Sequence, residues 1–241
     1  MFVLAIVSGK GGVGKTTTAV ALAAAFAPKR RTVLIDLDPT GGASYASGHD
    51  PSVLADRATA IGAMTELPMP ARTPEGYGLL AGTPDLERRA TLVRQEIERF
   101  RTLLQADVVV IDAPPGFGLL PQAAVLVADA VLVPLLLEPL AIRTTEHILG
   151  LFEGLGASAK LLGILPTGVE KRRALFGDQL LQIQGYGTRV FEPIPRLVAV
   201  AESALAGRSI LAYAPRSPAS SAYRALAETI TLERLNVLET V

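Results

Sequence analysis

The feature that most constrains this chain is a glycine-rich segment that follows an apolar run at residues 2–7. Residues 9–16 read GKGGVGKT and match the pattern G-x-x-x-x-G-K-[ST]. In such a segment successive backbone N–H groups turn inward around phosphate oxygens, in conformations that a Cβ atom would obstruct. The pattern therefore predicts a buried strand at 2–7, a helix at 16–26 and a phosphate-binding loop between them.

Particular residues of this loop have predicted roles. The Lys15 ammonium group is expected to bind the β- and γ-phosphates of a nucleotide, and the Thr16 hydroxyl is expected to ligate Mg²⁺. The cofactors expected for the chain are therefore ATP and Mg²⁺. The residues expected to contact the nucleotide in this segment are Gly11, Gly12, Val13, Gly14, Lys15, Thr16 and Thr17.

Short apolar runs recur along the chain, each about as long as a buried strand and each followed closely by Gly, Pro or Asp. They lie at residues 2–7, 33–37, 108–111, 131–137 and 161–164. Helical patterns separate them, among them 86–105, where apolar residues recur every three to four positions. This alternation predicts an α/β fold, in which helices cover both faces of a doubly wound, mostly parallel sheet. With no repeat or linker in 241 residues, we expect residues 1–241 to form a single domain.

Composition excludes several classes of protein. The chain has no cysteine, which rules out disulfides, Cys-ligated iron–sulfur clusters and thiol catalysis. Its most apolar stretch, residues 119–137, is interrupted by Pro121, Gln122, Asp129 and Pro134, which a helix alone in a bilayer would avoid. Hydrophobic residues make up 49% of the chain, which fits strands buried on both faces instead. A cytoplasmic protein is expected.

Acidic residues end two of the predicted strands. Asp36 and Asp38 close the run at 33–37, and their spacing on a strand would point both carboxylates the same way. Asp112 closes the run at 108–111 and would hold Mg²⁺, through water, beside the phosphate loop. Ligands of open α/β sheets bind at the carboxyl ends of the strands, so these residues are expected to share one crevice.

One residue of the loop is not required for phosphate binding. Lys10 follows the first glycine, and residues 10–17, KGGVGKTT, resemble the deviant Walker A motif of the ParA/MinD ATPases. In that family the first lysine reaches across an ATP-dependent homodimer to the phosphates of the partner. The resemblance implies that Lys10 acts in trans and, with Lys15, neutralises charge on the transferred phosphoryl group.

The acidic motif at 36–39, DLDP, resembles the switch motif of the same family. The resemblance makes Asp38 the catalytic residue that orients the attacking water and gives Asp36 a supporting place in the Mg²⁺ shell. The family usually continues PQGNAS, where this chain has PTGGAS, so the switch contacts that Thr40 and Gly42 would make across the dimer are left open. No glutamate follows Asp112, so activation of the attacking water depends on Asp38. A carboxylate that only positions water is a weak promoter, and we therefore expect slow hydrolysis that a partner stimulates.

The resemblance extends nearly to the end of the chain. Residues 193–217 are similar to the C-terminal part of partition ParA proteins, and Thr167 and Pro195 are candidates for the adenine pocket. Basic residues of this region bind DNA without sequence preference in the ATP-bound dimer of those proteins. The matching residues are Arg196, Arg208 and Arg216, with Arg224 a poorer candidate. About six phosphate contacts per dimer would give a log–log salt slope near −5.

Three functions are candidates for a chain with this P-loop. A ParA-type partition ATPase would bind nucleoid DNA and be stimulated by a ParB-like partner on the cargo. A MinD-like switch would need a basic amphipathic C-terminal helix to reach the membrane, whereas residues 222–241 carry Glu228, Glu233 and Glu239 against Arg224 and Arg234. The nitrogenase iron-protein branch needs cysteines, and a metabolic P-loop enzyme would need a further acid/base cluster. The first function is preferred, without membrane binding and with a nucleoid-associated location; the cargo, DNA or another body, stays open.

Overall fold

The expected central sheet is present in the structure, a computed structural model that describes residues 1–54, 59, 69–88, 90–91, 104–138, 141–170, 176–185 and 187–235. Within these residues, seven strands form one sheet in the order β3-β4-β2-β5-β1-β6-β7. The strands are β1 (Phe2–Ile6), β2 (Thr32–Asp36), β3 (Ala71–Arg72), β4 (Gly78–Leu80), β5 (Val108–Asp112), β6 (Ala130–Leu136) and β7 (Leu161–Thr167).

Strand pairing aligns the residues that matter for a ligand. All neighbouring strands are parallel except β3 and β4 at one edge. Asp112 at the end of β5 is in register with Ile6 on one side and with Asp36 on the other. The carboxyl ends of β1, β2 and β5 therefore form one rim, and the glycine-rich loop leaves β1 at that rim.

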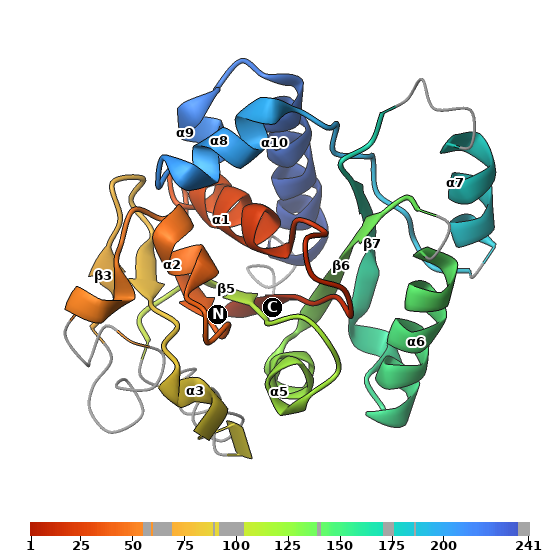
Figure 1. Cartoon of the computed structure of the whole chain (residues 1–241), viewed down its shortest axis with the longest axis horizontal. Helices are drawn as coiled ribbons and strands as arrows, with labels where there is room; N and C mark the ends of the chain where they lie inside the picture. Colours follow the sequence, from red (N-terminus) through yellow and green to blue (C-terminus); the bar gives the residue numbers. More distant parts are fainter. Residues whose placement is uncertain are drawn as a thin grey trace.

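Helices cover both faces of the sheet, as expected (Figure 1). Figure 1 shows α1, α8, α9 and α10 on one side and α3 and α5 on the other. The helix bounds are α1 (Lys15–Phe26), α2 (Gly42–Ala46), α3 (Asp85–Arg88), α5 (Leu119–Val127), α6 (Ala141–Gly154), α7 (Phe176–Gln184), α8 (Val198–Leu205), α9 (Ile210–Tyr213) and α10 (Pro218–Ile230). One turn of π-helix, Thr231–Leu235, follows α10.

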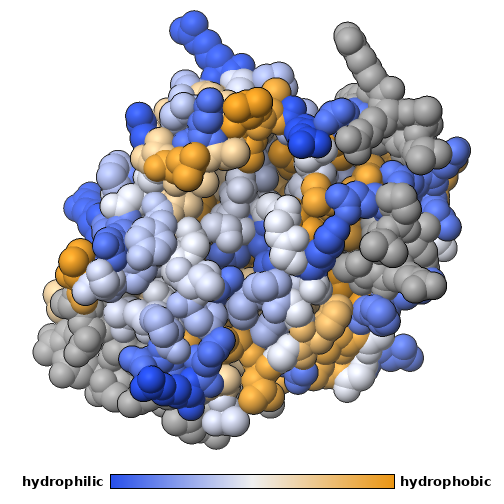
Figure 2. Space-filling view, viewed as in Figure 1, coloured by the Kyte–Doolittle hydropathy of each residue, from blue (hydrophilic) through white to orange (hydrophobic). Residues whose placement is uncertain are grey.

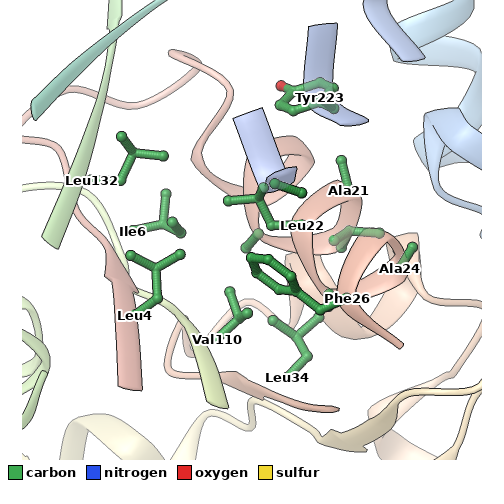
Figure 3. Close-up of a cluster of buried hydrophobic side chains, with 14 of the residues drawn as sticks. Leu4, Ile6, Ala21, Leu22, Ala24, Phe26, Leu34, Val110, Leu132 and Tyr223 are labelled. Carbon is green, nitrogen blue, oxygen red and sulfur yellow. The ribbon is translucent and has the colours of Figure 1, made fainter. Parts of the chain in front are cut away.

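The strands divide their side chains between two apolar layers. Along β1, Leu4 and Ile6 pack with α1 on one face, whereas Val3 and Ala5 pack with α5 on the other. Figure 3 shows Leu4 and Ile6 in the same cluster as Phe26 of α1. Burial on both faces explains why the strands read as unbroken apolar runs in the sequence.

Two expectations about elements need correction. The strand expected at 161–164 continues to Thr167, because residues 165–167 pair in parallel with residues 134–136 of β6. This extension carries Thr167 to the rim of the sheet. The helix expected at 86–105 does not reach its predicted end, since residues 104–105 are not helical, and residues 92–103 lie outside the described residues.

The last helix is part of the core. α10 packs on α1 and buries Tyr223, Leu226 and Ile230 in the same layer as β1. In the described part of the chain, no helix combines the length and the apolar character needed to span a bilayer.

Candidate nucleotide and metal site

The loop between β1 and α1 is built to hold an anion. Gly12 and Gly14 have left-handed backbones, with φ values of 73° and 84°, which favour glycine. α1 begins at Lys15 without a side-chain cap and without an acidic residue in its first turn. The free N–H groups and the positive end of α1 therefore face the loop and would attract phosphate.

The first glycine has a different constraint. A Cβ atom at Gly9 would lie 2.3 Å from Cζ of Phe117, so the aromatic ring occupies the space of a side chain. The ring of Phe117 also meets His147 edge to face, at 6.2 Å between centroids. No sequence motif indicates this role of Phe117, because the contact joins the loop to a segment more than a hundred residues away.

Lys15 is buried at the centre of the site, with 6% of its surface exposed. Its Nζ donates a hydrogen bond to the Lys10 carbonyl at 3.0 Å. Burial lowers the pKa of Lys15, and the carboxylates of Asp112 and Asp38 act in the opposite direction. A triphosphate would add negative charge around this ammonium group and favour its charged form.

One oxygen of a buried carboxylate next to the loop has no hydrogen-bond partner in the described structure. Oδ2 of Asp112 accepts a hydrogen bond from the Thr16 hydroxyl at 2.7 Å, but Oδ1 is buried and bonded to nothing in the described structure. Burial, and then the negative charge of Asp36, raise the pKa of Asp112 well above its usual value. A cation would satisfy the free oxygen and offset both effects.

The donor set fits Mg²⁺. Thr16 and Asp112 offer oxygen ligands, which Mg²⁺ prefers, and in such sites phosphates and water complete the octahedron. Among the described residues there is no group of three or more His, Cys, Asp or Glu side chains that could hold a metal alone. The residues therefore suit a metal that arrives with a nucleotide.

Asp36 is bonded mainly to the helix that follows it. Its Oδ2 accepts from the Ser44 backbone N–H at 2.9 Å and from the Ser44 hydroxyl at 2.7 Å, and its Oδ1 accepts from the Asp38 N–H. The side chain is fully buried, which raises its pKa to about 6 despite these hydrogen bonds. Its place in the Mg²⁺ shell stays a prediction, because Ser44 of α2 occupies Oδ2 and the Asp38 N–H occupies Oδ1.

Asp38 lines the same cavity as Lys15 and Thr16. Its Oδ1 accepts from the Thr40 backbone N–H at 2.9 Å and from the Thr40 hydroxyl at 2.7 Å. Thr40 is one of the two departures from the family pattern, and here it orients the expected catalytic carboxylate. The other, Gly42, lies near Thr16, where an added Cβ would make ordinary contact.

Lys10 has a partner within its own chain. Its Nζ lies 2.5 Å from Oε2 of Glu138, which follows β6, and both side chains are about half exposed. Exposed ion pairs of this kind contribute little to stability, up to about 1 kcal/mol. Lys10 can therefore leave Glu138 at small cost, and its action across a dimer stays a prediction.

A cavity of about 650 Å³ opens beside the loop, a volume within the range of nucleotide-sized ligand sites. Thr167 and Pro195 both line it, and the Thr167 hydroxyl donates to the Val13 carbonyl at 2.7 Å. Thr167 thus supports the backbone of the loop as well as the cavity wall. The far wall is formed by Leu197 and by small side chains of α8, namely Val200, Ala201 and Ala204.

The predicted DNA-binding arginines fall into two places. Arg196 lines the cavity, and its guanidinium lies 3.3 Å from Oε1 of Glu170. Arg208 and Arg216 are exposed in the loops that flank α9, and Arg224 donates to the Pro215 carbonyl. Figure 2 shows apolar side chains at the surface around α8, where Val198 and Leu205 are 76% and 90% exposed.

The glycine-rich loop joins β1 to the N-terminus of α1 at the rim of a parallel sheet, and the buried Asp112 lies beside Thr16 and close to Lys15. These features define a P-loop nucleotide-binding protein. Comparison with known families agrees: the sequence model of the CobQ/CobB/MinD/ParA nucleotide binding domain matches residues 4–210. The chain belongs to this family, which confirms the resemblance found in its loop.

Several curated relatives match almost the whole chain. The chromosome-partitioning ATPase Soj of Thermus thermophilus is 36% identical over 94% of this chain and 94% of its own. The chromosome partitioning protein ParA of Myxococcus xanthus is 34% identical, over 93% of this chain and 86% of its own.

Solved structures confirm the fold. Cobyrinic acid a,c-diamide synthase of Mycobacterium smegmatis, with a bound ATP analogue and magnesium, superposes with a TM-score of 0.80 at 33% identity, covering 97% and 96% of the two chains. MinD of Pyrococcus horikoshii, complexed with Mg-ADP, superposes with a TM-score of 0.78 at 23% identity, covering 98% of both chains.

Proposed function

We propose that this chain is a ParA-type ATPase that binds ATP and Mg²⁺, forms a nucleotide-sandwich homodimer, binds DNA without sequence preference and is switched off by hydrolysis. The observation that carries the proposal is the buried Oδ1 of Asp112, which has no hydrogen-bond partner in the described structure and lies close to Lys15. The phosphate loop that precedes Lys15 also contains Lys10. Relatives that match the chain end to end are named as partitioning ATPases.

Hydrolysis would use residues that already share the cavity. Backbone N–H groups of the loop and the Lys15 ammonium group bind the β- and γ-phosphates, and Thr16 and Asp112 hold the metal. Held by these two residues, Mg²⁺ would supply positive charge beside the transferred phosphoryl group. Asp38, oriented by Thr40, positions the attacking water. Because a carboxylate that only positions water is a weak promoter, unstimulated turnover is slow, and a ParB-like partner accelerates it.

Lys10 would make the reaction depend on a dimer. In one chain it pairs with Glu138. In a sandwich of two chains it would release Glu138 and contact the phosphates of the partner's nucleotide, where a second cation stabilises the transition state. Dimerisation therefore requires ATP and ends when the γ-phosphate is lost.

Exposed arginines support binding to DNA. Arg208 and Arg216 lie in adjacent loops around α9, so two copies in a dimer would present four cations. Arg196 lines the nucleotide cavity, where its guanidinium group would also interact with the bound nucleotide. Contacts with phosphates alone would give affinity without sequence preference and a steep dependence on salt.

Two alternatives concern the surface or cargo that is bound. A MinD-like attachment to membranes is less well supported, since the apolar face of α10 is already buried against α1. Positioning of a cargo other than DNA would use the same ATPase cycle with a different partner.

Co-sedimentation distinguishes these possibilities. The protein would be mixed with linear DNA or with anionic liposomes, each with ATP, ADP or no nucleotide. We expect it to sediment with DNA only in ATP, and the signal to fall steeply as salt rises. Sedimentation with liposomes would favour the MinD-like alternative. Failure to sediment with either, in a protein that dimerises with ATP, would contradict DNA binding and favour another cargo.

A further inference from the structure

The segments that follow two helices meet at a pair of glycines. α2 is followed by Gly48 and α8 by Gly207, and both have left-handed backbones, with φ values of 80° and 63°. A Cβ atom on Gly207 would lie 2.8 Å from Cα of Gly48, and one on Gly48 would lie 3.0 Å from the Gly207 carbonyl oxygen. We call this the glycine contact. Its two backbones pack directly, so neither can shift without the other.

A second set of contacts holds the same loop from the other side. In the turn between β3 and β4, the carboxylate of Glu75 accepts hydrogen bonds from the Ser209 backbone N–H, at 2.7 Å, and from the Ser209 hydroxyl. Tyr77, which follows this turn, donates to the Ser47 hydroxyl at 2.8 Å, at the end of α2. Residues 206–209, which include the exposed Arg208, are therefore held between α2 and this turn.

The opposite end of α2 is bonded to the metal site. Asp36 accepts two hydrogen bonds from Ser44, and it is in register with Asp112 on the neighbouring strand β5. α2 has only five residues, and the backbone N–H groups of Gly48 and His49 donate hydrogen bonds to the carbonyls of Tyr45 and Ser44 within it. A change around Asp36 that moves Ser44 would therefore move Gly48, and with it Gly207.

We propose that α2, the glycine contact and Glu75 position Arg208 for phosphate binding, and that they transmit the state of the metal site to this arginine. Gly48, Gly207 and Glu75 are positioning residues in this scheme, and they touch neither nucleotide nor DNA. The identity of the polyanion as DNA rests on the proposed function; the mechanical link between Asp36 and Arg208 does not.

The first test compares substitutions by their effect on the salt dependence of DNA binding in ATP. Arg208→Ala should reduce the magnitude of the log–log salt slope by about 2, since each lost phosphate contact removes about 0.9 and a dimer loses two. Gly207→Ala should give the same reduction, with ATP affinity and dimerisation unchanged, and the double variant should add nothing. A wild-type slope in Gly207→Ala would overturn the proposal.

Gly156→Ala is the matched control. Gly156 also has a left-handed backbone, with φ of 62°, but an added Cβ would meet nothing within 4 Å. The Gly156→Ala substitution introduces similar backbone strain at a site without a packed contact. The salt slope of DNA binding by this variant should therefore stay at the wild-type value.

Glu75→Ala keeps the proposal testable if Gly207→Ala folds poorly. Removal of an acidic group ordinarily strengthens binding to a polyanion. We expect weaker binding instead, by severalfold, because Ser209 loses both hydrogen bonds and Arg208 loses its position. Equal or tighter binding would contradict the role of Glu75.

The second test needs no DNA. Amide hydrogen exchange at residues 206–209 would be measured in wild type and Gly207→Ala, with Mg-ATP, Mg-ADP or no nucleotide. In the wild type, exchange at the Arg208 and Ser209 amides should change on addition of Mg-ATP, and this response should be lost in Gly207→Ala. Wild-type exchange that is identical in all three conditions would overturn the link. A nucleotide response without DNA binding would instead show that the proposed function has failed while the link holds.

Discussion

At the scale of single residues, the site depends on a few contacts that join distant parts of the chain. Thr16 and Asp112 are 96 residues apart in sequence and 2.7 Å apart in space. Each of these residue types could be predicted from its motif, because a P-loop and a strand-end acid have known chemistry. Thr40 as the partner of Asp38, and Glu138 as the partner of Lys10, could not be predicted, since no motif specifies them.

Asp112→Asn should separate stability from function. Asp112 is buried beside Asp36 with one unpartnered oxygen, so removing its charge should raise the free energy of unfolding without ligand by about 1 kcal/mol. The same change should abolish Mg²⁺-dependent ATP binding. Urea unfolding and calorimetry measure the two effects, with the exposed Asp85→Asn as control. A destabilised apo protein would contradict this account of the site.

Glu138→Gln should release Lys10. The pair is half exposed and contributes up to about 1 kcal/mol, so the ATP concentration needed for half-maximal dimerisation should fall by up to about fivefold. Light scattering during an ATP titration measures this concentration. A higher ATP requirement would mean that Glu138 itself contributes to the dimer.

At the scale of elements, the link between α10 and α1 is a single buried hydrogen bond surrounded by apolar contacts. The Tyr223 hydroxyl lies 3.1 Å from the Thr18 hydroxyl, and both side chains are buried. Tyr223→Phe would leave the Thr18 hydroxyl without a partner and should lower the free energy of unfolding by about 1–2 kcal/mol. Urea unfolding tests this, and the half-exposed Tyr213→Phe should have little effect. Equal effects of the two changes would contradict a special role for the α10–α1 bond.

The strands were predicted more successfully than the helices. β1, β2, β5 and β6 were each predicted to within one residue at either end, because strands buried on both faces leave an uninterrupted apolar run in the sequence. β7 extends beyond the apolar run at 161–164, because Pro166 and Thr167 interrupt the apolar pattern but still pair with β6. The helix at 86–105 was extended beyond its described end, because periodicity alone does not mark where a helix stops.

At the scale of the whole molecule, the sheet topology brings the predicted residues to one rim. Parallel strands and their order place the loop, Asp36 and Asp112 side by side, and strand–helix alternation was enough to predict this convergence. The route from Asp36 through α2 to Arg208 could not be predicted, because the contact between Gly48 and Gly207 spans 159 positions of the sequence and depends on backbone packing.

An ion pair at the amino-terminal ends of β2 and β5 should make the stability of the fold depend on pH. Arg31 donates to both oxygens of Asp107 and joins the starts of β2 and β5. The Arg31 contacts lower the pKa of Asp107 to about 2, below its usual value of 3.8. The stabilisation is therefore fully present above pH 3.8 and is lost as the pH falls through 2. Asp107→Asn should lower Tm at pH 7 and should lower it much less near pH 2, where about half of the carboxyl groups are protonated. A Tm difference that is the same at both pH values would contradict this assignment.

Lys10 is central to the proposed switch, because it would make dimerisation depend on bound ATP. Sedimentation velocity of Asp38→Ala, and of Asp38→Ala combined with Lys10→Ala, tests it directly in Mg-ATP, with ATP affinity of both proteins measured by calorimetry. We expect a stable dimer for the single variant and an ATP-bound monomer of similar ATP affinity for the double variant. Dimers of equal stability in both would contradict it.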